Sequence, residues 1–246
     1  MWKKEVQQFD RQLIIFITIY FFFVGTVGIG QPLIDMYQGI TLNVSYLRIL
    51  IHYIENIEGR TLHICKSKYP SFKTPNSSRK LYKNPLFLAE YELCLKQNFE
   101  HFNVIREAVK ILDGIIRWPM FLAILTFSLV LACALLTLIK GDTRIAPQLL
   151  SIMLLLMEAI ACAKICEGGE RISHLSDEVF SSFYKTKWIH CPHRIKTSML
   201  IIQECSKKPL SIKASGITEI NWNLFTKIMN SAYTYFNVLY AMDSTN

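Results

Sequence analysis

The sequence predicts an all-α integral membrane protein, a helical bundle with about four transmembrane helices and long cytosolic helix extensions. Hydrophobic residues make up 51% of the 246 residues and mean hydropathy is +0.26. The apolar residues gather in runs of about twenty, the length that crosses the hydrocarbon of a bilayer. Between these runs, apolar residues recur at helical spacing among charged ones, which indicates helices that continue beyond the membrane.

Four spans are expected within a single membrane domain of residues 1–246, and they lie at residues 12–34, 118–139, 145–166 and 221–242. The first run is too long and too bulky for the apolar core of a signal peptide, so it is expected to be retained. The third carries Glu158. An ionisable group at that depth faces protein or water, with either a functional role or a structural hydrogen bond.

Lysine and arginine in the loops set the orientation. Residues 35–117 hold twelve Lys and Arg, and residues 167–219 hold eight. Positive loops stay inside, so 35–117 is expected to be a cytosolic connection and 167–220 a cytosolic helical anchor region. The basic segment 1–11 disagrees, because alternation places it outside. Most of the net charge of +8 then lies on the cytosolic face, and nucleic-acid binding is not expected.

Three segments outside the spans have a recognisable pattern. Residues 46–54 and 86–117 repeat apolar residues at helical spacing, and the second leads directly into the span at 118–139. Residues 66–85 contain three prolines and many lysines, which predicts a loop. The apolar stripe of a cytosolic helix needs a partner, and residues 194–205 supply one.

No motif of an enzyme or a cofactor site is visible. The chain lacks a glycine-rich phosphate loop, a nucleophile elbow and the paired histidines of zinc proteases, so no catalytic residues and no cofactor are expected. His190, Cys191 and His193, with Cys205 beyond, lack the paired spacing of structural zinc sites, and a metal is not expected. The seven cysteines are expected to be free thiols.

The last run carries a distinct face. A helix places residues three and four apart on one side, and this side changes from hydroxyl-bearing to apolar along the residues Ser231, Thr234, Tyr235, Val238 and Met242. Two interpretations fit. The helix packs against its neighbours through small and polar residues, as bundle helices in lipid do, or the stripe is a pore wall that meets water.

The C-terminal third resembles the insect odorant receptors. The residues that carry the resemblance are Ser176, Val179, Tyr184, Trp188, the step Lys208-Pro209-Leu210, the turn Ala214-Ser215-Gly216 and the final segment 231–239. Upstream, the agreement is looser but extends over nearly the whole chain. In this family four subunits surround a central cation pore, and a tuning receptor assembles with a shared co-receptor. The resemblance therefore implies a tetrameric hetero-oligomer in which Val238 and Met242 form the gate.

The resemblance also implies where an odorant binds and what is missing. Family members have three spans ahead of the one beginning near Gln12, so the chain is expected to be incomplete at its N-terminus. The family's odorant pocket is built from the outer halves of several spans, two of which are present here. The candidate pocket residues are Phe16, Tyr20, Gln148, Ile152 and Met153.

The expected function is a tuning subunit of an odorant-gated cation channel for the sense of smell, in the cell membrane of a sensory neuron dendrite. Its expected partners are a small volatile odorant, the co-receptor and membrane lipid. Two alternatives remain open. One is a gustatory-type receptor subunit, although Ala241 and Met242 stand where that related family ends in Gln-Phe. The other is a non-channel four-span adaptor whose basic cytosolic region binds partners or anionic lipid.

Overall fold

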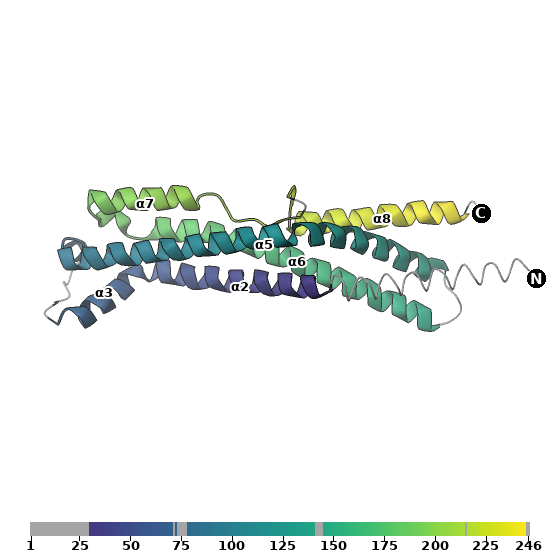
Figure 1. The fold of residues 1–246 in the computed structure, drawn as a ribbon, viewed down its shortest axis with the longest axis horizontal. Helices are drawn as coiled ribbons and strands as arrows, with labels where there is room; N and C mark the ends of the chain where they lie inside the picture. The colour runs from purple at the N-terminus through teal and green to yellow at the C-terminus, as the bar shows by residue number, and fades with distance from the viewer. Residues whose placement is uncertain (1–29, 71, 73–77, 141–144, 215, 245–246) are drawn as a thin grey trace, which may run out of the picture. The chain divides into compact units, whose positions relative to one another are not determined.

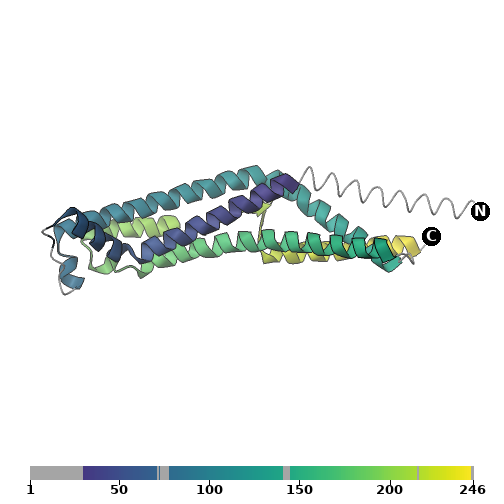
Figure 2. The ribbon, with the colours of Figure 1, turned by 90° about the horizontal axis from the view of Figure 1, so that it is seen from below.

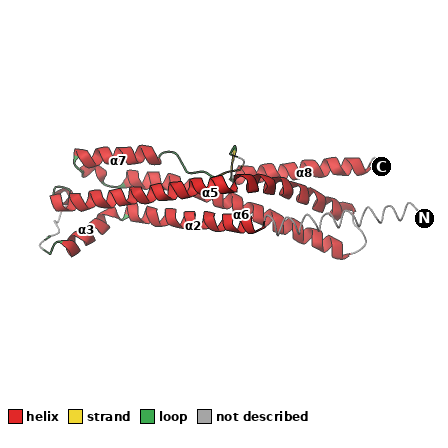
Figure 3. Ribbon diagram, in the orientation of Figure 1, coloured by secondary structure: helices red, strands yellow, loops and turns green. Residues whose placement is uncertain are grey.

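The computed structural model describes residues 30–70, 72, 78–140, 145–214 and 216–244. Its long elements are helices (Figure 3), which confirms the all-α prediction. In chain order the elements are α2 (Gly30–Glu55), α3 (Ile57–Lys68), α4 (Ser78–Leu81), α5 (Pro85–Lys140), α6 (Ile145–Lys185), the 3₁₀ turn η1 (Trp188–His190), α7 (His193–Ser206), β1 (Lys213–Ala214), β2 (Thr218–Glu219) and α8 (Trp222–Ser244).

The chain forms two compact units, each of which is described by itself. Unit 1 comprises the described residues within Met1–Gly39, Leu112–Gly169 and Lys213–Asn246. Unit 2 comprises Ile40–Ile111 and Glu170–Ile212. Helices α2, α5 and α6 contribute residues to both units, whereas α7 belongs to unit 2 and α8 to unit 1.

Unit 2 is a bundle in which parts of α2, α5 and α6 run side by side (Figures 1 and 2). Two contacts fix α7 along α5, because Arg194 binds Glu92 and Arg106 donates to the carbonyl of Cys205. Both helices therefore run in the same direction. The interior is filled by large apolar side chains that include Ile40, Leu47, Leu50, Ile54, Phe87, Tyr91, Leu95, Phe102, Ile172, Val179, Phe183, Ile195 and Met199. The segment 194–205, predicted to pack against the helices outside the spans, lies in α7 and contacts α5, which confirms that packing.

Among the described residues, the interior of unit 1 has a larger share of small side chains than that of unit 2, and these lie mainly on α5, α6 and α8. They are Ala123, Ala132, Ala134, Cys162, Cys166 and Ala232, together with Met120, Phe127, Leu224 and Ile228. Alanine and cysteine let helix backbones approach closely, as is usual between helices in lipid. Composition therefore distinguishes the two units, since the interior of unit 2 is dominated by large aliphatic and aromatic groups.

Helix α5 bends by 48° between Trp118 and Met120. The intervening residue is Pro119, which has no backbone N–H to donate to the preceding turn of the helix. Among the described helices, none passes by itself a test of length and apolarity for crossing a membrane, but the two arms of this bend, Pro85–Trp118 and Met120–Ala132, pass it together.

The helical expectations for 46–54 and 86–117 are confirmed, because they lie within α2 and α5. The expected spans at 118–139 and 145–166 lie within α5 and α6, and the last within α8 apart from Asn221. Most of 12–34 falls outside the described residues. Membrane crossing at these positions stays a prediction.

The prediction of a loop over 66–85 is partly wrong. Helix α3 continues to Lys68 and α4 covers Ser78–Leu81. Tyr82 is 3% exposed, and its ring packs edge-on against the rings of Phe87 and Tyr91 at 5.4 and 5.9 Å. This aromatic burial holds the end of the segment in unit 2, against the local signal of its prolines and lysines.

Candidate functional site

The candidate pore helix α8 begins at a side-chain cap. The Oδ1 atom of Asn221 accepts a hydrogen bond from the backbone N–H of Leu224 at 3.0 Å, which satisfies one of the free donors of the first turn. Leu224, Ile228 and Ala232 then follow at intervals of four and are all at most 5% exposed. This row packs the first half of α8 into unit 1.

The hydroxyl-to-apolar stripe is uncovered in the single chain. Ser231, Thr234, Tyr235 and Val238 are exposed, and Val238 retains 53% of its side-chain surface. Thr234 donates its hydroxyl to the carbonyl of Asn230 at 2.9 Å, so its methyl group and oxygen remain on the helix surface. The side chain of Met242 lies outside the described residues. The face chosen from the sequence is therefore available to something other than this chain.

A hairpin in front of α8 is tied to α5 by a residue that sequence reasoning missed. The Oδ1 atom of Asp113 accepts the backbone N–H of Lys213 at 2.7 Å, and its Oδ2 atom binds Arg117 at 3.2 Å. The hairpin pairs β1 with β2 and turns at Gly216, whose φ of +74° suits glycine. The sequence offered one signal for this residue. Asp113 is an isolated carboxylate one helical turn before Arg117, which precedes the predicted span at 118–139.

Gly169 fixes how closely the chain entering α8 approaches α6. A Cβ atom placed on Gly169 would lie 2.1 Å from the carbonyl oxygen of Ile220 and 3.0 Å from its carbonyl carbon. Neither backbone atom can move without displacing the residue before the cap Asn221. Glycine is required here for space, and nothing in its sequence surroundings predicted the contact.

Among the signature residues, Ser176 acts as a latch in unit 2. It is 1% exposed, and its Oγ atom accepts the backbone N–H of Leu210 at 2.8 Å while donating to the carbonyl of Ser173 at 2.8 Å. Pro209 stands immediately before the bound amide and is exposed. The serine and the Lys-Pro-Leu step, which are far apart in the sequence, thus form one contact.

Tyr184 and Trp188 form a second local contact. The indole Nε1 of Trp188 donates to the carbonyl of Tyr184 at 3.2 Å, and this bond closes the chain between α6 and η1. The ring of Tyr184 itself is 64% exposed. Ser176, Pro209, Tyr184 and Trp188 therefore shape unit 2 and are not part of the α8 stripe.

The candidate odorant residues are not brought together in the described residues. Phe16 and Tyr20 lie outside them. Ile152 and Met153 are 43% and 66% exposed on α6, on a face that also carries exposed Leu149 and Leu156, and Gln148 is half-buried nearby. A face of this kind suits lipid as well as a pocket wall. A pocket of about 360 Å³ beside Glu219, Asn223 and Lys227 includes none of the candidates.

The histidine and cysteine cluster does not converge. Cys191 is 4% exposed, whereas His190 and His193 point to an exposed surface, and no metal-binding group is found among the described residues. Burial raises the pKa of the Cys191 thiol to about 11, which keeps it protonated and unreactive at neutral pH. No disulfide joins the six cysteines whose side chains the structure describes.

These features define an all-α protein with a packed helical bundle in unit 2 and a last helix that presents an uncovered face. The family model described as 7tm Odorant receptor matches residues 4–233, which is most of the chain. The chain therefore belongs to the odorant receptor family, a family of receptors and not of enzymes, and the resemblance noted from Ser176 onward is confirmed.

Two curated relatives and one solved structure illustrate the match. The chain is 27% identical over 74 residues to Odorant receptor 94a of Drosophila melanogaster, covering 30% of this chain and 19% of that protein. It is 27% identical over 75 residues to Putative odorant receptor 92a of the same species, covering 30% and 18%. These matches thus span about a fifth of the relatives' length.

The solved structure is the insect olfactory receptor OR5 from Machilis hrabei in complex with eugenol. It superposes with a TM-score of 0.53 at 13% identity, covering 87% of this chain and 70% of that one. At this identity the likeness concerns the fold alone, and it agrees with the all-α architecture.

Proposed function

We propose that the chain is a tuning subunit of an odorant-gated cation channel, assembled with an odorant co-receptor in the membrane of a sensory neuron dendrite. Family membership supports a receptor of small odorants. The observation that carries the channel role is the uncovered face of α8, where hydroxyl groups at Ser231 and Thr234 give way to Val238. Hydroxyl groups that their own chain leaves open are better placed against water or another subunit than against lipid tails.

The gate is assigned to Val238 and Met242. Apolar side chains at a constriction exclude water and therefore ions until they turn away. The hydroxyl-bearing part of the stripe can instead solvate a passing cation. Binding of an odorant to the bundle would open the channel by favouring a state in which the apolar end of α8 leaves the axis.

Odorant contact is assigned to the outer halves of the helices. The proposed pocket residues remain Phe16, Tyr20, Gln148, Ile152 and Met153. OR5 binds eugenol, and an odorant of comparable size and polarity would suit one polar amide among apolar groups. Replacement of Met153 by a charged residue is the substitution most disruptive to such a wall.

The experiment is the paired substitution Val238→Ala with Met242→Ala, co-expressed with an odorant co-receptor in oocytes. Current without odorant is expected to rise severalfold, or the ion selectivity to change, because the constriction becomes wider. Tyr240→Ala is the matched control, since Tyr240 is 48% exposed on the opposite side of α8. Equal currents and selectivity in the double variant and the unaltered chain would remove the gate assignment.

A further inference from the structure

Two stretches of the sequence contain basic residues but no carboxylate, namely residues 61–89 and 179–203. Unit 2 brings them together at the end where α5 begins. The ring of Tyr82 lies 6.0 Å from the ring of His190, and the hydroxyl of Tyr82 donates to Glu58 at 3.4 Å. The two stretches are far apart in the sequence, and the contact of Tyr82 with His190 brings described residues of both to one end of unit 2.

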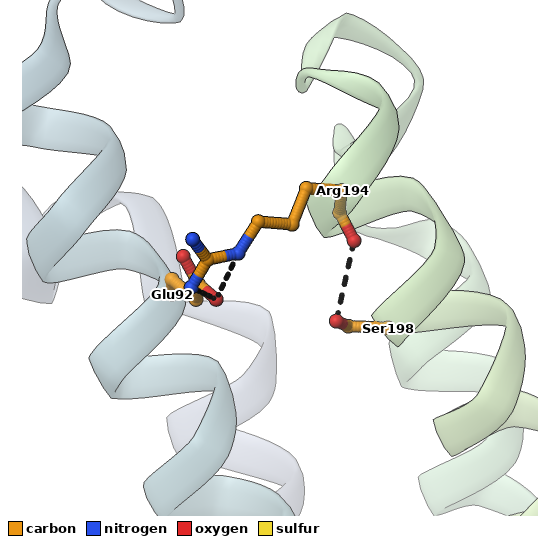
Figure 4. A network of polar contacts seen from close by, with 3 residues as sticks. All are labelled: Glu92, Arg194 and Ser198. Carbon is orange, nitrogen blue, oxygen red and sulfur yellow. Dashed lines mark hydrogen bonds and ion pairs between the residues drawn. The ribbon is translucent and has the colours of Figure 1, made fainter.

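The carboxylates that border this surface are already bound. The ion pairs are Glu58 with Lys187 at 2.9 Å, Glu90 with Lys68 at 2.6 Å and Glu92 with Arg194 at 2.8 Å, the last of which is shown in Figure 4. Four exposed lysines make no ion pair among the described residues, and we call them the basic end: Lys66, Lys80, Lys83 and Lys185. Their charge is therefore not neutralised within unit 2.

Large apolar side chains are exposed in the same stretch of chain as Lys185. Tyr184, next to Lys185, is 64% exposed, and Ile189 in η1 is 66% exposed. Ile189 is held near Tyr184 because Trp188 hydrogen-bonds the Tyr184 carbonyl. Exposed aromatic and aliphatic groups with polar groups around them are typical of a surface that binds a protein partner, where apolar anchors are ringed by polar contacts.

The chemistry of this surface favours a protein partner. The unpaired lysines call for carboxylates or other anions. The exposed Tyr184 and Ile189 add large apolar groups of the kind that anchor a protein partner within a polar rim. Binding to anionic lipid is a separate outcome of the test below.

We propose that the basic end docks an acidic protein segment that carries large apolar side chains. The lysines would meet its carboxylates, and Tyr184 with Ile189 would receive its apolar groups. The cytosolic position of this surface rests on the proposed topology of the receptor. The docking chemistry does not involve the α8 gate.

The test uses the full chain in nanodiscs of zwitterionic lipid, with fluorescence anisotropy of labelled peptides. The probes are a peptide of alternating glutamate pairs and phenylalanine, and an all-glutamate peptide of equal length. Lys83→Glu with Lys185→Glu is expected to weaken binding of the mixed peptide about tenfold. The control Lys207→Glu with Lys208→Glu makes the same change of net charge on exposed residues after α7, and a change below about twofold is expected.

The apolar contribution has its own variant. Tyr184→Ser with Ile189→Ser is expected to weaken binding of the mixed peptide severalfold while leaving the all-glutamate peptide unchanged. If the charge variant does not fold by circular dichroism, Lys83→Gln with Lys185→Gln replaces it, with a smaller loss expected.

Several results would overturn the proposal. One is an equal loss in the control pair, which would indicate general charge attraction. Another is tighter binding of a single-stranded oligonucleotide or of phosphatidylserine vesicles that the same lysine variant abolishes, which would assign another class of partner. Odorant-evoked current is recorded in parallel. If the lysine variant loses peptide binding but keeps odorant-evoked current, the docking surface is supported as separate from the channel. If the unaltered chain binds the peptide but gives no odorant-evoked current, the proposed channel function is contradicted and the docking proposal stands.

Discussion

Replacing Ser176 with alanine isolates the latch that joins α6 to the chain after α7. The change removes the oxygen that accepts the backbone N–H of Leu210 at 2.8 Å. That N–H is part-buried and would lose its partner, which costs about 1–3 kcal/mol. Alanine has a higher helix propensity than serine and returns about 0.5 kcal/mol. The free energy of unfolding is thus expected to fall by about 0.5–2.5 kcal/mol.

For a chain of this size the loss corresponds to a fall of about 1–10 °C in melting temperature. The assay is thermal unfolding of the purified chain in detergent, followed by circular dichroism. Ser198→Ala is the matched control, because the Ser198 hydroxyl bonds the carbonyl of Arg194 within α7 at 3.2 Å (Figure 4). The control should change the free energy of unfolding by less than about 0.5 kcal/mol. Equal melting temperatures for the two variants would refute the latch.

Two further predictions concern packing and pH. Gly169→Ala should destabilise the chain by about 1–3 kcal/mol, because the new Cβ meets the carbonyl of Ile220. Gly114→Ala, which has open space on its helix, should instead stabilise it by about 0.5–1 kcal/mol, and both are read from chemical unfolding. The hydrogen bond from Lys68 lowers the pKa of Glu90, so its stabilisation is present above the unfolded carboxyl value of about 4.3 and lost as pH falls through the folded value. Between pH 7 and pH 3 the melting temperature should fall less for Glu90→Gln than for the unaltered chain. The same dependence of melting temperature on pH in both proteins would contradict the pairing of Glu90 with Lys68.

The helices could be predicted because their signals are local. Apolar periodicity located α5 and α7, and the run of charge-free residues located the part of α5 after Arg117. The end of the loop at 66–85 could not be predicted in the same way. Its proline and lysine content predicts a solvated loop. Burial of the Tyr82 ring among other aromatic rings stabilises a packed conformation by more than the local preference for a loop opposes it. Tertiary packing decided that position.

In the candidate site, too, the features with a local signal could be predicted and the contacts between distant residues could not. The stripe on α8 follows from helical spacing. In the structure the side chains of its described members are exposed on one side of the helix, as the spacing predicted. The contacts of Asp113 with Lys213 and of Gly169 with Ile220 join residues far apart in the chain. A single sequence contains no information on which distant backbone atom an isolated carboxylate or glycine will meet. In the proposed channel, other subunits cover the stripe, and no local pattern encodes which residues of those subunits it meets.

Water access along α8 tests the central claim most directly. Single cysteines are placed at Val238 and at Tyr233, which lies about 140° around the helix from it, in a background where exposed Cys205 is replaced by serine. The chain is assembled with a co-receptor and treated with a charged, water-soluble thiol reagent, with and without odorant. The cysteine at position 238 is predicted to react with the reagent, and to react faster when odorant is present. The cysteine at position 233 is predicted not to react, because in the assembled channel it faces away from the pore. Equal protection, or equal reaction, at both positions would contradict a pore lined by this face.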